Sequence, residues 1–296
     1  MANFTGAIAL QATLTSHSLL GVWRELRKNP AASTAAVIVG LYVLVAVIGP
    51  LIAPHPPNET ALVDRLHAPS QEHWMGTDGL GRDILSRCIY GARVSILIGF
   101  LSVTLCVVVG VGMGLMAGYY RGRLDSVFSR ASEILMAFPY LISAIAMMAF
   151  LGPGFFNLVW ALALRGWVEF FRLARGDTLA QQTREYVDAA RSLGQPDWQI
   201  MLSEILPNIV PSIIVLATLR VGFMIVLEAS LSFLGVGIPP SIPAWGSMIS
   251  EGRGVLFIAW WVSTLPGLIL MVLVLAINLF GEGLREVLDP RLKVQT

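Results

Sequence analysis

The sequence contains none of the residue patterns that commonly support catalysis. No Gly-x-x-x-x-Gly-Lys-Ser/Thr sequence that would hold a nucleotide phosphate occurs, and no Ser/His/Asp or Cys/His set is placed for nucleophilic chemistry. The two cysteines, Cys88 and Cys106, are too few for a disulfide framework or a metal cluster. His55, His67 and His73 are spread over one polar segment without metal-ligand spacing. We therefore expect no catalytic residue, no metal and no cofactor in this chain.

Polar residues inside long apolar stretches are the next candidates for function. Arg220 and Glu228 are eight residues apart, about two helical turns, so they share a helix face. Ionisable groups within a membrane span are costly and face the protein interior or a watery cavity. We expect Arg220 and Glu228, with Asn278, to line a polar pathway through the protein. The alternatives are an ion pair or a charge that orients the helix for Arg220 and Glu228, and a contact between helices for Asn278.

Composition indicates a membrane protein. Hydrophobic residues make up 55% of the 296 residues and charged residues only 13%, whereas a soluble domain carries about 25% charged residues. The charges gather between long uncharged stretches, which is the layout of a polytopic membrane protein. The net charge of +1 gives no field that would favour nucleic acid. The first 30 residues lack a signal-peptide layout, so we expect the first apolar stretch to be retained.

The apolar stretches predict an all-α integral membrane protein with six transmembrane helices. A span needs about 20 apolar residues to cross the hydrocarbon layer. The expected spans are 31–53, 94–118, 132–151, 155–173, 209–230 and 258–280. Gly152, Pro153 and Gly154 separate the third span from the fourth. Arg165 is unusual within the fourth span, where it either faces a partner subunit or indicates that the span is shifted.

Lys and Arg residues predict the orientation. With the N-terminus inside, most of the Lys and Arg residues between spans lie on the cytoplasmic side, as the positive-inside rule requires. Residues 1–30 and 285–296 are then cytoplasmic, and residues 54–92 form an external loop before a transmembrane core at 93–284. A second outer segment at 235–257 is either a loop or a stretch that dips back into the protein.

A stripe of glycines lies within the second span. Gly110, Gly114 and Gly118 recur every four residues on one helix face. With Gly112, they nominally fit a dinucleotide-binding fingerprint, but no strand precedes them and no acidic residue follows at the required distance. Small residues at this spacing let two transmembrane helices approach closely. We therefore expect a packing surface for another helix.

The segment from 184 to 208 predicts a helix–turn–helix on the cytoplasmic side. The pattern favours a helix over about 177–193, with Gly194 as its left-handed C-terminal residue. Pro196 then opens a second helix, and Pro207 begins the next span. One face of the second helix is apolar and contains Trp198, Met201, Leu202 and Ile205. Such a face can insert into a groove on a partner protein, although a connector lying on the lipid surface is the alternative.

The residues of this segment resemble a known motif. Asp188-Ala189-Ala190, then Gly194, then Leu206-Pro207 resembles the EAA loop of ABC importer permeases, which contacts the ATPase. Asp188 stands where Glu is usual, which keeps the charge, and Ile205 precedes Leu206 as in the peptide-transporter branch.

The resemblance extends from about residue 23 to 293. The stretches 73–87, 90–93, 228–237 and 260–291 resemble the second permease subunit of dipeptide and oligopeptide ABC importers. The same family includes permeases for nickel, glutathione and sugar-opine compounds, so the solute stays open between these classes.

This resemblance implies a type-1 ABC importer permease fold in the plasma (inner) membrane of a prokaryote. It implies a homologous second permease, two cytoplasmic ATPase subunits that bind ATP and Mg²⁺, and an extracytoplasmic solute-binding protein. It also implies a set of residues that couple the permease to the ATPase: Asp188, Ala189, Ala190, Gly194, Ile205, Leu206 and Pro207.

Two other classes compete with this interpretation. A secondary transporter driven by an ion gradient requires carboxylates at mid-membrane and usually a repeated half. The chain offers Glu169 and Glu228, each near the end of a span, and no evident repeat. A membrane-embedded enzyme is disfavoured because the catalytic sets named above are missing.

Overall fold

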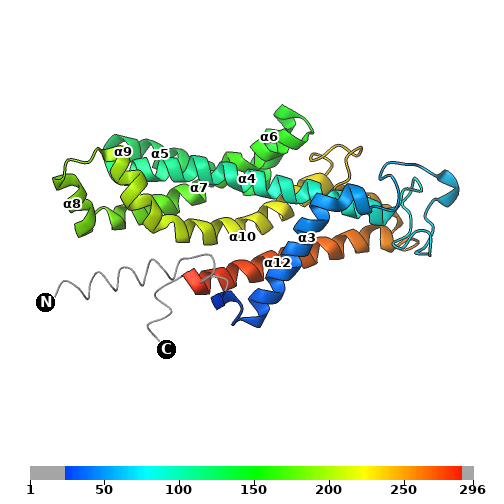
Figure 1. Cartoon of the computed structure of the whole chain (residues 1–296). Helices are drawn as coiled ribbons and strands as arrows, with labels where there is room; N and C mark the ends of the chain where they lie inside the picture. Colours follow the sequence, from blue (N-terminus) through cyan, green and yellow to red (C-terminus); the bar gives the residue numbers. More distant parts are fainter. Residues whose placement is uncertain (1–23, 289–296) are drawn as a thin grey trace.

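The computed structural model describes residues 24–288 as a bundle of helices (Figure 1). Most of the expected N-terminal segment and C-terminal tail therefore lies outside the described residues. The long helices are α3 (Pro30–Ile52), α4 (Ile84–Tyr120), α7 (Phe155–Gln181), α10 (Leu206–Phe233) and α12 (Trp261–Leu288). Shorter helices are α5 (Gly122–Met136), α6 (Tyr140–Leu151), α8 (Glu185–Ser192), α9 (Asp197–Gln199) and α11 (Trp245–Gly252). Single turns are η1 (Leu62–Asp64), the π-helix η2 (Ile200–Ile205) and η3 (Arg253–Val255).

Side-chain caps fix where two of the long helices begin. The Asn29 side chain accepts hydrogen bonds from the backbone N–H groups of Ala31 and Ala32, at 3.1 and 3.2 Å, and Pro30 follows in the first turn of α3. The Asp83 carboxylate accepts from the Ser86 backbone N–H at 2.7 Å. This cap starts α4 at Ile84, ten residues before the span expected at 94–118, and the helix is 37 residues long. At about 1.5 Å per residue it is longer than a bilayer core, so α4 extends beyond the membrane.

The glycine stripe is a packing surface, as expected from its spacing. A Cβ atom on Gly114 would lie 2.7 Å from Ala174 Cβ, and one on Gly118 would lie 2.7 Å from Thr178 Cβ. Gly110 meets the backbone of α7 in the same way. Larger residues here would force α4 and α7 apart, so the close contact between these two helices depends on the glycines.

Within residues 24–288, four continuous helical stretches are long and apolar enough to cross a membrane: 30–52, 84–120, 197–233 and 261–288. The pair α5–α6 passes the same test together but is bent by 92°. The expectation of one straight helix over 132–151 is therefore wrong, because Pro139 lacks a backbone N–H and disfavours helical geometry in the residue before it. Helix α7 carries Arg165, Glu169 and Arg172 and is not among these stretches. The count of six spans stays a prediction that requires α5–α6 and α7 each to cross.

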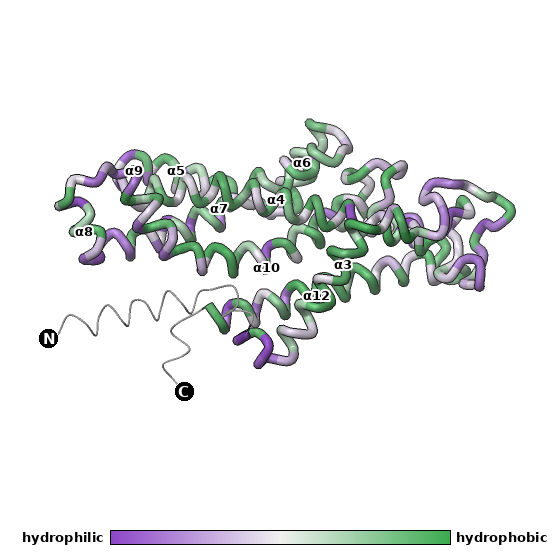
Figure 2. The backbone as a smooth tube through the Cα atoms, in the orientation of Figure 1, coloured by the Kyte–Doolittle hydropathy of each residue, from purple (hydrophilic) through white to green (hydrophobic). Residues whose placement is uncertain are grey.

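Hydrophilic residues gather at the two ends of the bundle, and its middle is apolar (Figure 2). The segment between α3 and α4 occupies one end, and α8 and α9 occupy the other (Figure 1). The start of α3 lies beside the end of α12, where the Asn29 side-chain amide donates to Glu286 Oε2 at 3.0 Å. The first and last described residues therefore lie on the same side of the bundle. That this side is cytoplasmic stays a prediction.

The outer segment at 235–257 folds back into the protein. Its short helix α11 packs against α4, α10 and α12. Trp245 is fully buried, and its ring N–H donates to the Cys88 carbonyl oxygen at 3.0 Å. Helix α11 is therefore packed into the protein, and whether it lies at membrane depth stays a prediction.

Charged residues join this returning segment to the loop before α4. Asp78 Oδ2 accepts from Arg82 Nε at 2.6 Å, and Arg82 and Arg87 both contact Glu251, at 2.8 and 3.4 Å. Arg87 is only 1% exposed. Because these charges are largely withdrawn from water and paired, the network holds this end of the bundle in one arrangement.

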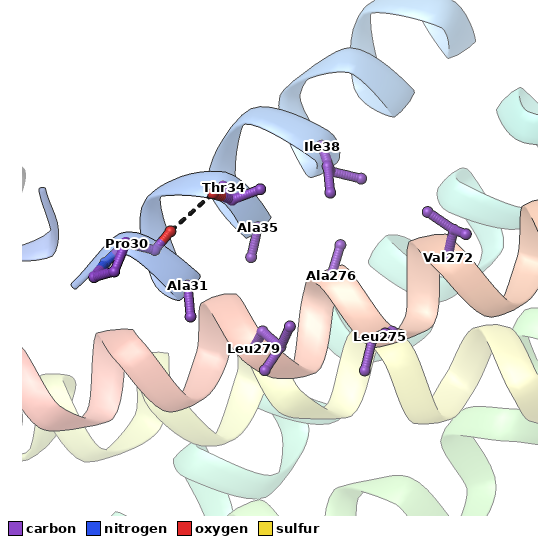
Figure 3. A pocket seen from close by; sticks show the side chains of 9 residues that line it. All are labelled: Pro30, Ala31, Thr34, Ala35, Ile38, Val272, Leu275, Ala276 and Leu279. Atoms are coloured by element: carbon purple, nitrogen blue, oxygen red, sulfur yellow. Dashed lines mark hydrogen bonds between the residues drawn. The ribbon is translucent and has the colours of Figure 1, made fainter.

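An apolar groove lies between α3 and α12 on the surface of the bundle (Figure 3). The polar side chain that lines it, Thr34, donates to the Pro30 carbonyl oxygen of its own helix at 2.8 Å. The groove therefore offers no free polar group that could orient a polar solute.

Candidate coupling segment and pathway residues

The predicted helix–turn–helix is present, with different bounds. Helix α7 continues to Gln181, a turn at 182–184 follows, and α8 begins at Glu185. The helix expected over about 177–193 is therefore interrupted. We call the stretch 185–205, from the start of α8 to the end of η2, the coupling segment.

Gly194 has the left-handed conformation expected from the sequence, with φ of +78°. The Gln195 N–H donates to the Ala190 carbonyl oxygen at 3.2 Å, and the Gly194 N–H donates to the Arg191 carbonyl oxygen at 3.0 Å. These two bonds form a Schellman motif, which satisfies carbonyl groups left open at the end of α8. The turn is thus fixed by backbone bonds that require a left-handed residue at position 194.

The inner face of the coupling segment packs on the rest of the protein. Val187, Ile200 and Ile205 are fully buried, and Ala190 and Met201 are nearly so. The expectation that Trp198, Met201, Leu202 and Ile205 form one face for a partner is wrong, because Met201 and Ile205 point into this chain's own core. The apolar residues of the second helix are therefore divided between two faces.

The outer face of the coupling segment consists of Leu193, Trp198 and Leu202. Their exposed fractions are 82%, 62% and 53%. Asp188 and Ala189 are also exposed, on the same segment. Large exposed apolar side chains beside polar residues, at a hydrophilic end of a membrane protein, are typical of a protein–protein contact.

Tyr119, at the end of α4, anchors the coupling segment. Its hydroxyl donates to Asp197 Oδ1 at 2.8 Å, and its carbonyl oxygen accepts from the Gln182 side chain at 2.7 Å. The Arg191 guanidinium lies 5.4 Å from the centre of the Tyr119 ring and contacts Asp188 Oδ1 at 3.3 Å. Hydrogen bonding to Tyr119 raises the pKa of Arg191, which stays charged. Tyr119 was missed from the sequence, where only its position at the end of an apolar span could have pointed to it.

Given the resemblance to ABC importer permeases, we expect Tyr119→Phe to weaken coupling between ATP hydrolysis and uptake. The substitution removes one hydrogen bond to a carboxylate, worth about 1.5–3 kcal/mol, and frees the start of α9 from α4. Uptake per ATP hydrolysed, measured in proteoliposomes, should fall. Tyr120→Phe is the matched control, because Tyr120 is the exposed neighbour and its hydroxyl lies outside this set of bonds. Equal ratios in the two variants would contradict an anchoring role.

A π-helical turn joins the coupling segment to α10. Pro207 has no N–H to donate, and the Leu206 N–H donates to the Met201 carbonyl oxygen, five residues back. Pro207 lies in the first turn of α10, as expected, but without a break in the chain: residues 197–233 form one continuous helical stretch. The backbone of the coupling segment is therefore continuous with α10.

Arg220 does not pair with Glu228. It forms an ion pair with Glu169 of α7, and its guanidinium lies 5.1 Å from the centre of the Phe223 ring. Arg220 and Glu169 are each 29% exposed. The Glu169 Oε2 atom of this ion pair is itself buried, so the exposed surface belongs to other atoms of the two side chains.

Arg165 holds the bend between α5 and α6. Its Nε donates to the Leu135 carbonyl oxygen at 3.3 Å, and its guanidinium lies 5.0 Å from the centre of the Tyr140 ring. The Tyr140 ring contacts Phe223 edge-on, with 5.5 Å between centroids. Arg165 is therefore linked through Tyr140 and Phe223 to Arg220. It also provides a hydrogen-bond donor for a carbonyl at the end of α5.

Glu228 is fully buried between α4 and α10. Ser95 Oγ donates to one carboxylate oxygen and Ser232 Oγ to the other, both at 2.8 Å. Glu228 therefore links α4 to α10 through these hydrogen bonds. Nothing in this placement supports its expected position along the pathway. Asn278 is exposed on α12, and its place along the pathway stays a prediction.

Comparison with known proteins decides the family. The family of binding-protein-dependent transport system inner membrane components matches residues 110–294, and the N-terminal transmembrane domain of oligopeptide transport permease C matches residues 19–69. This chain belongs to that transport family. It is a multi-pass permease subunit of an ABC importer in the inner membrane, and the family implies an ATPase and a solute-binding protein as partners.

The permease is similar in sequence to its relatives over nearly its whole length. The glutathione transport system permease protein GsiD of Pectobacterium atrosepticum is 40% identical over 97% of each chain. The dipeptide transport system permease protein DppC of Alkalihalophilus pseudofirmus is 40% identical over 94% of this chain and 92% of its own. GsiD of Shigella sonnei is 43% identical over 92% and 90%. These relatives are named as transport permeases rather than enzymes.

A solved structure shares the fold of the permease. A chain of the MetNI methionine ABC transporter, in an inward-facing conformation, matches 69% of this chain and 97% of its own length with a TM-score of 0.58. Its sequence is 20% identical, so the likeness concerns the fold alone. The expected type-1 ABC importer permease fold is confirmed.

Proposed function

We propose that this permease imports dipeptides, short oligopeptides or glutathione, and that it forms half of the translocation pathway with a homologous second permease. The names of its relatives support these solutes, because they are glutathione and dipeptide permeases of similar length. Two ATPase subunits drive transport from the cytoplasmic side, and an extracytoplasmic protein delivers the solute.

The observation that carries the ATPase-driven part of this proposal is the shape of the coupling segment. It is a short helix–turn–helix whose inner face is packed on the chain's own core and whose outer face exposes Leu193, Trp198 and Leu202. A rigid element of this kind transmits motion, because packed surfaces move as units. Closure of the ATPases on ATP would press on the outer face, and the continuous helix from α9 to α10 would carry the displacement into the membrane.

We place the pathway beside Arg220 and Glu169. Their ion pair lies at a contact of α7 with α10, and both side chains retain exposed surface. Phe223, which is 37% exposed, and the ring of Tyr140 adjoin them. Paired opposite charges beside aromatic rings suit a solute that carries both a free amine and a carboxylate, as peptides do.

Neutral variants at Arg220 and Glu169 test this placement. We expect Arg220→Gln combined with Glu169→Gln to insert normally, since no unpaired charge is left, and yet to import dipeptides more slowly than the parent chain. Uptake of radiolabelled dipeptide into proteoliposomes measures the effect. Arg285→Gln, on an exposed residue at the end of α12, is the control. Wild-type uptake in the double variant would show that the ion pair only holds α7 and α10 together.

A further inference from the structure

Two histidines and an aspartate that are far from regular spacing in the sequence meet in the loop before α4. The ligand atoms of His55, His73 and Asp83 all lie within 4.8 Å of one another. The centres of the two imidazole rings are 4.8 Å apart, and His73 Nδ1 is hydrogen-bonded to Asp83 Oδ1 at 3.0 Å. The fold thus brings together residues whose spacing in the sequence did not indicate a metal site.

The backbone around this cluster is fixed by other bonds. The His55 N–H donates to Ser86 Oγ at 3.0 Å, and the Ser86 N–H donates to Asp83 Oδ2 at 2.7 Å. The Asp83 side chain is 1% exposed and that of His73 is 13% exposed. One carboxylate oxygen of Asp83 is therefore committed to the helix cap and the other to His73. His55 is half-buried, and its Nε2 also lies 3.2 Å from the Glu72 carbonyl oxygen.

We propose that His55, His73 and Asp83 bind a divalent transition metal, with Zn²⁺ as the best match. Two imidazoles and one carboxylate are a common set of three protein ligands for zinc, with water in the fourth position. Atoms bound to one tetrahedral zinc lie about 3.3 Å apart, given metal–ligand distances of about 2.0–2.1 Å. Modest side-chain rotations must therefore draw the three residues together when the metal binds.

Metal binding at this cluster would join three separate parts of the chain. His55 lies just after α3, His73 lies in the middle of the loop, and Asp83 caps α4. A metal held by all three would fix the end of α3 against the start of α4.

Zinc content of the purified importer tests this proposal. The complex is treated with a chelator, dialysed against micromolar ZnCl2 and analysed by mass spectrometry for zinc per permease chain. We expect one zinc in the parent chain and about none in His55→Ala or His73→Ala. The control is His67→Ala, in the same loop but exposed and outside the cluster, which should retain the metal.

Cobalt provides a second readout that does not depend on transport. Co²⁺ added to the parent complex should give the visible absorption of a tetrahedral site, and His55→Ala should remove that absorption while the variant remains monodisperse. Zinc content and cobalt spectra that are the same in His55→Ala and the parent chain would overturn the proposal. So would a parent chain that retains no zinc, which would leave the cluster as a set of hydrogen bonds.

Discussion

Replacing Gly194 with valine should abolish solute uptake while the ATPase subunits continue to hydrolyse ATP. Gly194 has a φ of +78°, and an L-residue in this left-handed region costs about 1–2 kcal/mol, with β-branched residues the least tolerant. A Cβ atom at this position would meet no atom within 4 Å. The expected effect is therefore conformational: valine would open the Schellman turn and displace the outer face of the coupling segment.

Two other variants isolate this conformational effect. Gly194→Asn should keep most of the uptake, because asparagine tolerates the left-handed region although it is larger than glycine. Gly176→Val places the same side chain on α7, at an open position whose φ is not positive. The measurement is the number of solute molecules imported per ATP hydrolysed in proteoliposomes. A wild-type ratio in Gly194→Val would show that the turn does not transmit motion.

Replacing Leu193 with aspartate should release the ATPase from the permease. Leu193 is the most exposed residue of the outer face, so the substitution disturbs no packing within this chain. A minority of interface side chains contribute more than 1 kcal/mol each, and a charge placed in an apolar contact adds a desolvation cost. We expect at least about a tenfold weaker association, since each 1.4 kcal/mol is a factor of ten.

The amount of ATPase that copurifies with the permease measures this effect. Val63→Asp is the matched control, because Val63 is 98% exposed in the loop at the other end of the bundle. Its complex should contain the normal amount of ATPase. Equal retention in the two variants would place the ATPase contact elsewhere on the chain.

Local signals in the sequence predicted the turn at Gly194 but not the break at 182–184 or the π-helical turn that joins the segment to α10. The left-handed Gly194 and the glycine stripe of α4 follow from properties of single residues and short spacings, and both are present. The start of α3 and the position of Pro207 in the first turn of α10 also follow from local rules. These features need no knowledge of which helices are neighbours.

Features that depend on tertiary contacts could not be predicted. Met201 and Ile205 share helical spacing with Trp198 and Leu202, yet only packing against the core decides which of them are buried. Arg220 had two possible carboxylate partners, and the contact of α7 with α10 selected Glu169. The anchor at Tyr119 and the cluster of His55, His73 and Asp83 likewise join residues that are far apart in the chain.

Cross-linking from position 193 tests the coupling segment most directly. The two native cysteines, Cys88 and Cys106, are both buried, so Leu193→Cys supplies one accessible thiol. A thiol-to-amine cross-linker applied to the assembled importer should join this chain to an ATPase subunit, with a yield that changes when ATP is added. Val63→Cys should give no such product. A transport-competent Leu193→Cys importer that forms no cross-link to the ATPase would contradict the docking of the ATPase on this segment.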